Sequence, residues 1–120
     1  NLVDLNRDAV ALSQPESNVL RTTFDSYKPD ICFNLHGQRT IFSAGSVKKS
    51  ASLSFLSPSQ DVDKTITPSR KLGMRIISEI NNVLQQYLPN QIGRYDDGHN
   101  INCVGDKFQS LNVFFQIYEN

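Results

Sequence analysis

Phe33-Asn34-Leu35-His36-Gly37-Gln38 is the stretch on which the predicted fold depends, because an apolar segment ends there in a histidine followed by a glycine. Apolar residues bounded by a turn-forming glycine are typical of a strand that has just ended. In open α/β sheets the ligand crevice lies at the carboxyl ends of the strands. His36 is therefore a candidate to face a substrate or a metal. The alternative is a strand-end histidine that hydrogen-bonds a neighbouring carbonyl.

A strand and a helix are predicted ahead of this histidine. Residues 2–5, Leu-Val-Asp-Leu, have the content of a short strand and lead directly into Asn6-Arg7-Asp8. A helix is then predicted from Ser13, Pro15 and Glu16, because a serine and a glutamate three residues later form a capping box and proline suits the first helical turn. Glu16 is assigned to this cap rather than to substrate contact.

The predicted helix has one apolar stripe and a defined end. Its stripe consists of residues at helical spacing, namely Val19, Leu20, Thr23, Phe24 and Tyr27. The helix stops before Pro29, because proline disfavours helix in the residue that precedes it. A strand, a helix and a second strand of this kind form a right-handed crossover with the two strands parallel. We therefore expect Arg7 and His36 at the same edge of one sheet.

The second half of the chain is predicted to contain two further strands and one long helix. The strands are expected at residues 53–56 and 113–118, from their apolar and aromatic content. The helix opens at Thr67-Pro68, and residues 92–105 are predicted to be a long loop because they are rich in Gly, Asp and Asn. The helix stripe consists of Leu72, Ile76, Ile80, Val83, Leu84 and Tyr87, and Pro89 follows it.

Together these elements indicate an α/β domain with a mixed, largely parallel sheet and helices packed on its faces. Both ends of residues 1–120 cut through predicted sheet elements, so we expect one partial domain of a larger unit. The charge is balanced, with 12 basic and 12 acidic residues, which argues against a nucleic-acid or membrane partner. No apolar run approaches the ~20 residues of a bilayer span. The compartment stays open, extracellular and periplasmic locations included, and Cys32 and Cys103 are predicted to be buried free thiols.

Three short segments of the sequence occur in an order that matches a known enzyme family. Leu2-Val3-Asp4-Leu5-Asn6-Arg7-Asp8 is followed by Pro15-Glu16-Ser17 and by Phe33-Asn34-Leu35-His36. This order and spacing resemble the zinc carboxypeptidases, peptidase family M14. Gly93-Arg94-Tyr95-Asp96-Asp97-Gly98 and the terminal strand are compatible with the second half of that family's catalytic domain. The resemblance implies that residues 1–120 form the C-terminal portion of such a domain.

The resemblance also implies a role for five residues. His36 matches the last zinc ligand, a neutral imidazole. Asn6 and Arg7 match the pair that binds the terminal carboxylate of the substrate, a task that suits a planar guanidinium with two parallel N–H donors. Tyr95 falls at the position of a tyrosine that closes over the substrate. Glu119 falls at the position of the general base, which deprotonates zinc-bound water.

Each of these roles has a structural alternative. Arg7 could form a surface ion pair with Asp4 or Asp8. Tyr95 could be a loop aromatic that covers the core. Glu119 could be a solvated carboxylate at the end of a strand.

Two questions concern metal binding. His99 with Asp96 and Asp97 suggests a metal site, for which a solvated turn is the favoured alternative.

A catalytic zinc takes about three protein ligands plus water, and in the M14 family two of them come from a His-x-x-Glu motif ahead of the Asn-Arg segment. Nothing precedes Asn1 in this sequence. We therefore expect an upstream segment to supply those ligands, and residues 1–120 alone to be inactive.

The leading hypothesis for function is a zinc-dependent metallocarboxypeptidase that hydrolyses C-terminal peptide bonds, with zinc as cofactor and a peptide or small carboxylate as substrate. The first alternative is a non-catalytic binding or structural domain that has lost the metal. The second is a related N-acyl amino acid deacylase, whose substrates also present a carboxylate to Arg7.

Overall fold

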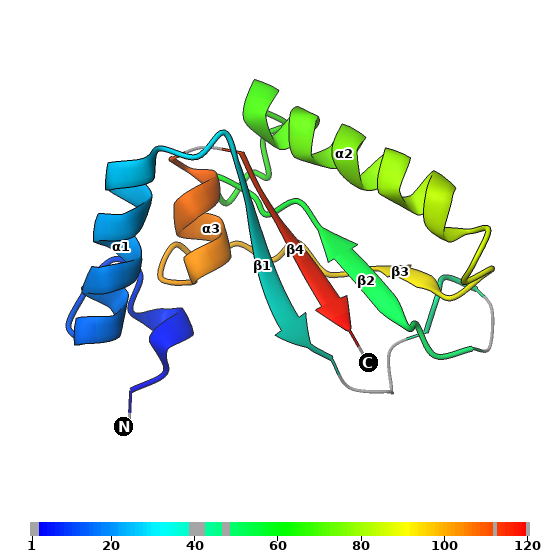
Figure 1. The fold of residues 1–120 in the computed structure, drawn as a ribbon, viewed down its shortest axis with the longest axis horizontal. Coiled ribbons are helices and arrows are strands. Elements are labelled where there is room, and N and C mark those ends of the chain that lie inside the picture. The colour runs from blue at the N-terminus through cyan, green and yellow to red at the C-terminus, as the bar shows by residue number, and fades with distance from the viewer. Residues whose placement is uncertain (1–2, 39–42, 47–48, 112, 120) are drawn as a thin grey trace.

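A sheet with the strand order β1-β4-β2-β3 organises the fold (Figure 1). The computed structural model describes residues 3–38, 43–46, 49–111 and 113–119, and the side chains of residues 113–116 are outside that description. The strands are β1 (Ile31–Gly37), β2 (Leu53–Leu56), β3 (Ile92–Arg94) and β4 (Val113–Glu119). The helices are α1 (Pro15–Tyr27), α2 (Pro68–Leu84) and α3 (Val104–Gln109), preceded by a short 3-10 helix, η1 (Leu5–Arg7).

The sheet is mixed, so the predicted α/β class is confirmed and the expectation of a largely parallel sheet is met only in part. β1 runs parallel to β4, and β2 runs parallel to β3. β2 and β4, in the middle of the sheet, are antiparallel. The parallel pair places the carboxyl ends of β1 and β4 side by side, with His36 opposite Tyr118 and Gly37 opposite Glu119.

The strand predicted at residues 2–5 is wrong. Leu2 lies outside the described residues, Val3 and Asp4 are irregular, and η1 begins at Leu5. The Asp4 carboxylate accepts a hydrogen bond from the Asn6 backbone N–H at 2.9 Å, and a local bond of this kind competes with strand pairing. The predicted crossover is therefore also wrong, because the parallel partner of β1 is β4 from the end of the chain.

α1 begins and ends where the sequence predicts, but the predicted capping box does not form. Gln14 is the N-cap residue, and its side chain makes no capping bond. Instead the Asp8 carboxylate accepts hydrogen bonds from the Ser13 N–H (2.9 Å), the Ser13 hydroxyl (2.7 Å) and the Gln14 N–H (2.9 Å). The Asp8 carboxylate, which lies outside the helix, thereby accepts the hydrogen bonds of the donors just ahead of α1. A local capping motif does not predict this role.

The apolar stripe predicted on α1 is largely exposed. Val19, Leu20 and Tyr27 are 65 %, 45 % and 82 % exposed. Of the predicted stripe Phe24 does pack, and its ring meets the Phe108 ring of α3 edge to face with centroids 4.7 Å apart. The spacing therefore predicted the helix correctly and its buried face only in part.

α2 opens as predicted, with the Thr67 hydroxyl accepting from the Arg70 N–H at 3.3 Å and Pro68 in the first turn. It ends at Leu84, ahead of a turn that precedes Pro89. Its most buried residues are Arg70 and Gly73, which lie outside the predicted stripe. Ile76, Ile80 and Leu84 of that stripe are half-buried. Leu72, Val83 and Tyr87 of the predicted stripe are exposed.

The long loop predicted at residues 92–105 contains two elements, β3 and the start of α3. β3 is short and includes Gly93, at which a Cβ would lie 2.5 Å from the Ser54 hydroxyl oxygen of β2. Glycine in a strand often marks such a close approach of two segments. No helix within the described residues is long and apolar enough to cross a lipid bilayer.

Candidate functional site

A cavity of about 300 Å³ lies between α1, α3 and the end of β1. Two of the predicted site residues, Asn6 and His36, line it. Their neighbours in the lining include Glu16 and Ser17 of α1 and Asn34 of β1. The structure therefore places Asn6 and His36 around one cavity, although the strand from which this was expected does not form.

Asn6 and Arg7 are held by the start of α3. The Asn6 side-chain oxygen accepts from the Val104 N–H at 2.9 Å. Arg7 Nη1 donates to the Asn6 carbonyl at 2.8 Å and to Cys103 Sγ at 3.1 Å. Within the described residues Arg7 makes no ion pair with Asp4 or Asp8, and its side chain stays exposed. Arg7 thus lies beside the cavity rather than in its lining.

The two cysteines are unpaired, as predicted, but both are half-buried rather than fully buried. Burial raises the pKa of the Cys103 thiol, which outweighs the opposite effect of the nearby Arg7 guanidinium. Cys103 is therefore a neutral acceptor for Arg7 at neutral pH.

His36 is half-buried near the carboxyl end of β1. Its Nε2 lies 2.8 Å from the side-chain nitrogen of Asn34, rather than against a neighbouring carbonyl. Burial lowers the pKa of His36, so the imidazole is neutral at neutral pH, which is the form that binds metals. A ligand approaching Nε2 would have to displace the Asn34 amide.

The imidazole of His36 belongs to a stack of three rings. It lies parallel to the ring of Tyr118, with centroids 5.0 Å apart, and Tyr118 stacks in turn on Tyr95 at 3.8 Å. Burial raises the pKa of Tyr118 well above its usual range. Tyr95 therefore packs over a buried ring of the sheet, next to the ring that contacts His36. Sequence reasoning missed Tyr118, because only the register between β1 and β4 brings it opposite His36.

Glu119 is the last residue of β4 and is exposed. Its register partner on β1 is Gly37, and its carbonyl accepts from the Gln38 N–H at 2.7 Å. Successive side chains of a strand point to opposite faces. Glu119 and His36 therefore lie at the same edge of the sheet but on opposite faces. Tyr118 lies on the same face as His36.

No cluster of three or more His, Cys, Asp or Glu side chains suited to a metal occurs in the part of the chain that the structure describes. Asp97 instead binds two cations, Arg70 at 2.7 Å and Lys64 at 2.9 Å, which lower the pKa of its carboxyl to about 2. His99 Nδ1 lies 3.1 Å from the Ser59 carbonyl oxygen. The segment around Asp97 and His99 is thus tied to the core rather than forming the solvated turn favoured from the sequence.

Comparisons with protein-family models, with curated proteins and with solved structures found no match to this chain.

Proposed function

We propose that this chain carries part of the substrate site of a zinc-dependent metallocarboxypeptidase that hydrolyses C-terminal peptide bonds. The observation that carries the proposal is the shared cavity of Asn6 and His36, with the Arg7 guanidinium beside it. A peptide end needs a fixed cation for its carboxylate, and a metallopeptidase needs a neutral imidazole nearby.

Each residue has its own task in this proposal. Arg7 and Asn6 bind the terminal carboxylate, and His36 supplies one imidazole ligand. Tyr95 covers the bound substrate, for which its ring has to leave the stack with Tyr118. Glu119 accepts the proton as the general base, which requires its carboxylate to turn over the edge of the sheet toward His36.

The described residues do not complete a zinc site by themselves. One imidazole, that of His36, lines the cavity, whereas a catalytic zinc takes about three protein ligands. The proposal therefore requires a His-x-x-Glu motif upstream in the full reading frame. Sequencing that frame is the cheapest test, since a frame without the motif excludes the metallopeptidase.

The kinetic test replaces Arg7 by alanine in the protein expressed from its full reading frame. The expected result is a KM raised by about tenfold or more for peptides with a free C-terminal carboxylate and little changed for amidated peptides, because only the former lose a charge-assisted hydrogen bond. Arg21→Ala is the matched control, since Arg21 pairs with Asp25 on the exposed surface of α1. Equal losses on both peptides would remove Arg7 from the carboxylate role.

A second candidate is a non-catalytic binding or structural domain that has lost the metal. It predicts no stoichiometric zinc by elemental analysis of the full protein. Bound zinc together with chelator-sensitive peptidase activity would exclude it. An N-acyl amino acid deacylase is separated from the carboxypeptidase by the substrate, because it cleaves N-acyl amino acids and leaves peptides intact.

A further inference from the structure

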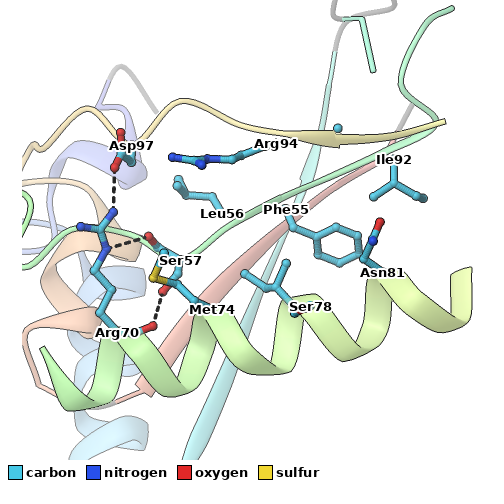
Figure 2. Close-up of a pocket in the computed structure, with 12 residues that line it drawn as sticks. Phe55, Leu56, Ser57, Arg70, Met74, Ser78, Asn81, Ile92, Arg94 and Asp97 are labelled. Carbon is cyan, nitrogen blue, oxygen red and sulfur yellow. Dashed lines mark hydrogen bonds and ion pairs between the residues drawn. The ribbon is translucent and has the colours of Figure 1, made fainter. Parts of the chain in front are cut away.

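A second cavity, of about 330 Å³, lies between α2 and the strands β2 and β3 (Figure 2). It is on the opposite face of the sheet from His36. Phe55, which lines it, is the register partner of Ile117, whereas His36 is the partner of Tyr118. Neighbouring residues of a strand face opposite sides, so the sheet itself separates this cavity from the one that His36 lines.

The body of this cavity is apolar. Phe55 from β2 and Ile92 from β3 form one wall, and Met74 and Ile77 from α2 form the other. Phe55 is buried, whereas Met74 is 38 % exposed, so the cavity runs from the core to an open side. Apolar walls with few polar groups are typical of small-molecule sites.

One end of the cavity carries excess positive charge. Arg70 and Lys64 share a single carboxylate, that of Asp97. The guanidinium of Arg94 points along the cavity toward the same end, and within the described residues it forms no hydrogen bond or ion pair (Figure 2). Among the charged residues that line the cavity, two cations, Arg70 and Arg94, therefore accompany one carboxylate, that of Asp97.

We propose that this cavity binds a straight-chain aliphatic monocarboxylate, such as a medium-chain fatty acid anion. The carboxylate pairs with Arg94, which can donate two parallel N–H bonds to it. The alkyl chain lies between Phe55 and Ile77, where it is removed from water. The charge excess selects an anion, and the apolar walls select a tail over a bare ion such as phosphate.

The test is a ¹H–¹⁵N NMR titration with three probes: octanoate below its micelle concentration, octan-1-ol and acetate. Octanoate is expected to shift the backbone amide signals of Gly93 and Ser78, which line the cavity on opposite walls, in a saturable way. Octan-1-ol has the tail without the charge, and acetate has the charge without the tail, so both should bind at least tenfold more weakly. Equal affinity for octanoate and either control, or no shift at the two amides, would overturn the proposal.

Two variants assign the binding to the cavity. Arg94→Gln should weaken octanoate binding by about tenfold or more and leave octan-1-ol unchanged, since a charged hydrogen bond is lost. Ser78→Phe should obstruct the cavity and weaken both ligands. Arg75→Gln is the matched control, an exposed arginine of α2 outside the lining, and should bind octanoate as the parent does. Equal losses in Arg94→Gln and Arg75→Gln would show a general charge effect and overturn the assignment.

Discussion

The two faces of the sheet bury a charged group in different ways. On the α2 face the guanidinium of Arg70, 4 % exposed, pairs with the Asp97 carboxylate at 2.7 Å and donates to the Ser57 carbonyl at 3.3 Å (Figure 2). On the α1 face the carboxylate of Asp8, 2 % exposed, is satisfied by N–H and O–H donors of Ser13 and neighbouring residues. Within the described residues no cation pairs with Asp8.

The two charged side chains differ in the sequence separation of their hydrogen-bond partners. Arg70 joins α2 to the segment after β2 and to the segment after β3, so its contacts depend on the assembled fold. The Asp8 carboxylate interacts with residues close to it in the sequence, Ser13 and Gln14 just ahead of α1 and Ser17 in its first turn. The α2 face should therefore respond strongly to loss of one side chain. The α1 face should respond weakly to loss of most of its apolar side chains, because α1 contacts α3 through Phe24 and leaves much of its remaining apolar surface exposed.

Arg70→Ala should produce the largest effect, a loss of about 3 kcal/mol in the free energy of unfolding measured by urea denaturation. Removing the guanidinium deprives Asp97 of its buried partner and leaves the Ser57 carbonyl without a donor. Lys64→Ala is the control, since the Lys64 side chain is 46 % exposed, and it should lose less than about 1 kcal/mol. Equal losses in the two variants would contradict the distinction between a buried and a surface partner of Asp97.

Gly93→Ala tests the sheet that both faces share. The added Cβ would lie 2.5 Å from the Ser54 hydroxyl oxygen and 3.0 Å from the Ala51 Cβ, so the Ser54 side chain would have to rotate and the backbone at Ala51 would have to shift. We expect a loss of about 1–3 kcal/mol in unfolding free energy. Gly37→Ala, which adds a Cβ with no atom within 4 Å, should change it by less than about 0.5 kcal/mol. In a Ser54→Ala background the effect of Gly93→Ala should shrink, and a constant effect would place its cause elsewhere.

Much of the regular structure could be predicted from the sequence, because local signals specify it. Pro15 and Lys28-Pro29 bound α1, Thr67 and Pro68 open α2, and apolar runs mark β1, β2 and β4. β3 and α3 were missed because residues 92–105 as a whole are rich in Gly, Asp and Asn, whereas pairing with β2 stabilises β3 and packing on Phe24 stabilises α3. The part of the inward face of α2 at Arg70 was missed because a buried arginine is recognisable only once its partner Asp97 is known.

The candidate site was predictable to a smaller extent. A strand end with a histidine is a local pattern, and His36 lies near the end of β1 and lines a cavity as expected. Asn6 reaches the same cavity through a hydrogen bond to Val104, a residue far along the chain. Tyr118 and Asn34 contact His36 because of strand register and side-chain packing, which the sequence does not encode locally.

A pH series compares the carboxylates of Asp8 and Asp97 directly. Hydrogen bonds from Ser13 and Gln14 lower the pKa of Asp8 to about 2, from an ordinary value of 3.8. A carboxyl whose folded-state pKa is lowered adds stability that is complete above its unfolded pKa and is lost as the pH falls through the folded value. Unfolding free energies measured between pH 5 and pH 2 should therefore fall less steeply in Asp8→Asn than in the parent.

Salt then separates Asp8 from Asp97. The pKa of Asp97 is also lowered to about 2, but by the cations Lys64 and Arg70. Asp97→Asn should flatten the pH dependence as Asp8→Asn does. High salt should reduce the contribution of Asp97 to the free energy of unfolding, since its ion pair with Lys64 is partly exposed. It should leave the contribution of Asp8 nearly unchanged. Equal salt sensitivity of the two carboxylates would contradict the contrast between charge pairing and hydrogen bonding.

Val19→Ala should produce the smallest effect, a change of less than about 0.5 kcal/mol in unfolding free energy. Val19 is 65 % exposed on α1, so little buried area is lost, and alanine favours the helix more than valine does. Phe24→Ala on the same helix should be clearly more destabilising, because Phe24 contacts the buried ring of Phe108. If thermal or urea unfolding showed equal losses for the two variants, the exposed side of α1 would be packed in solution, and the α1 face would no longer be the more weakly attached of the two.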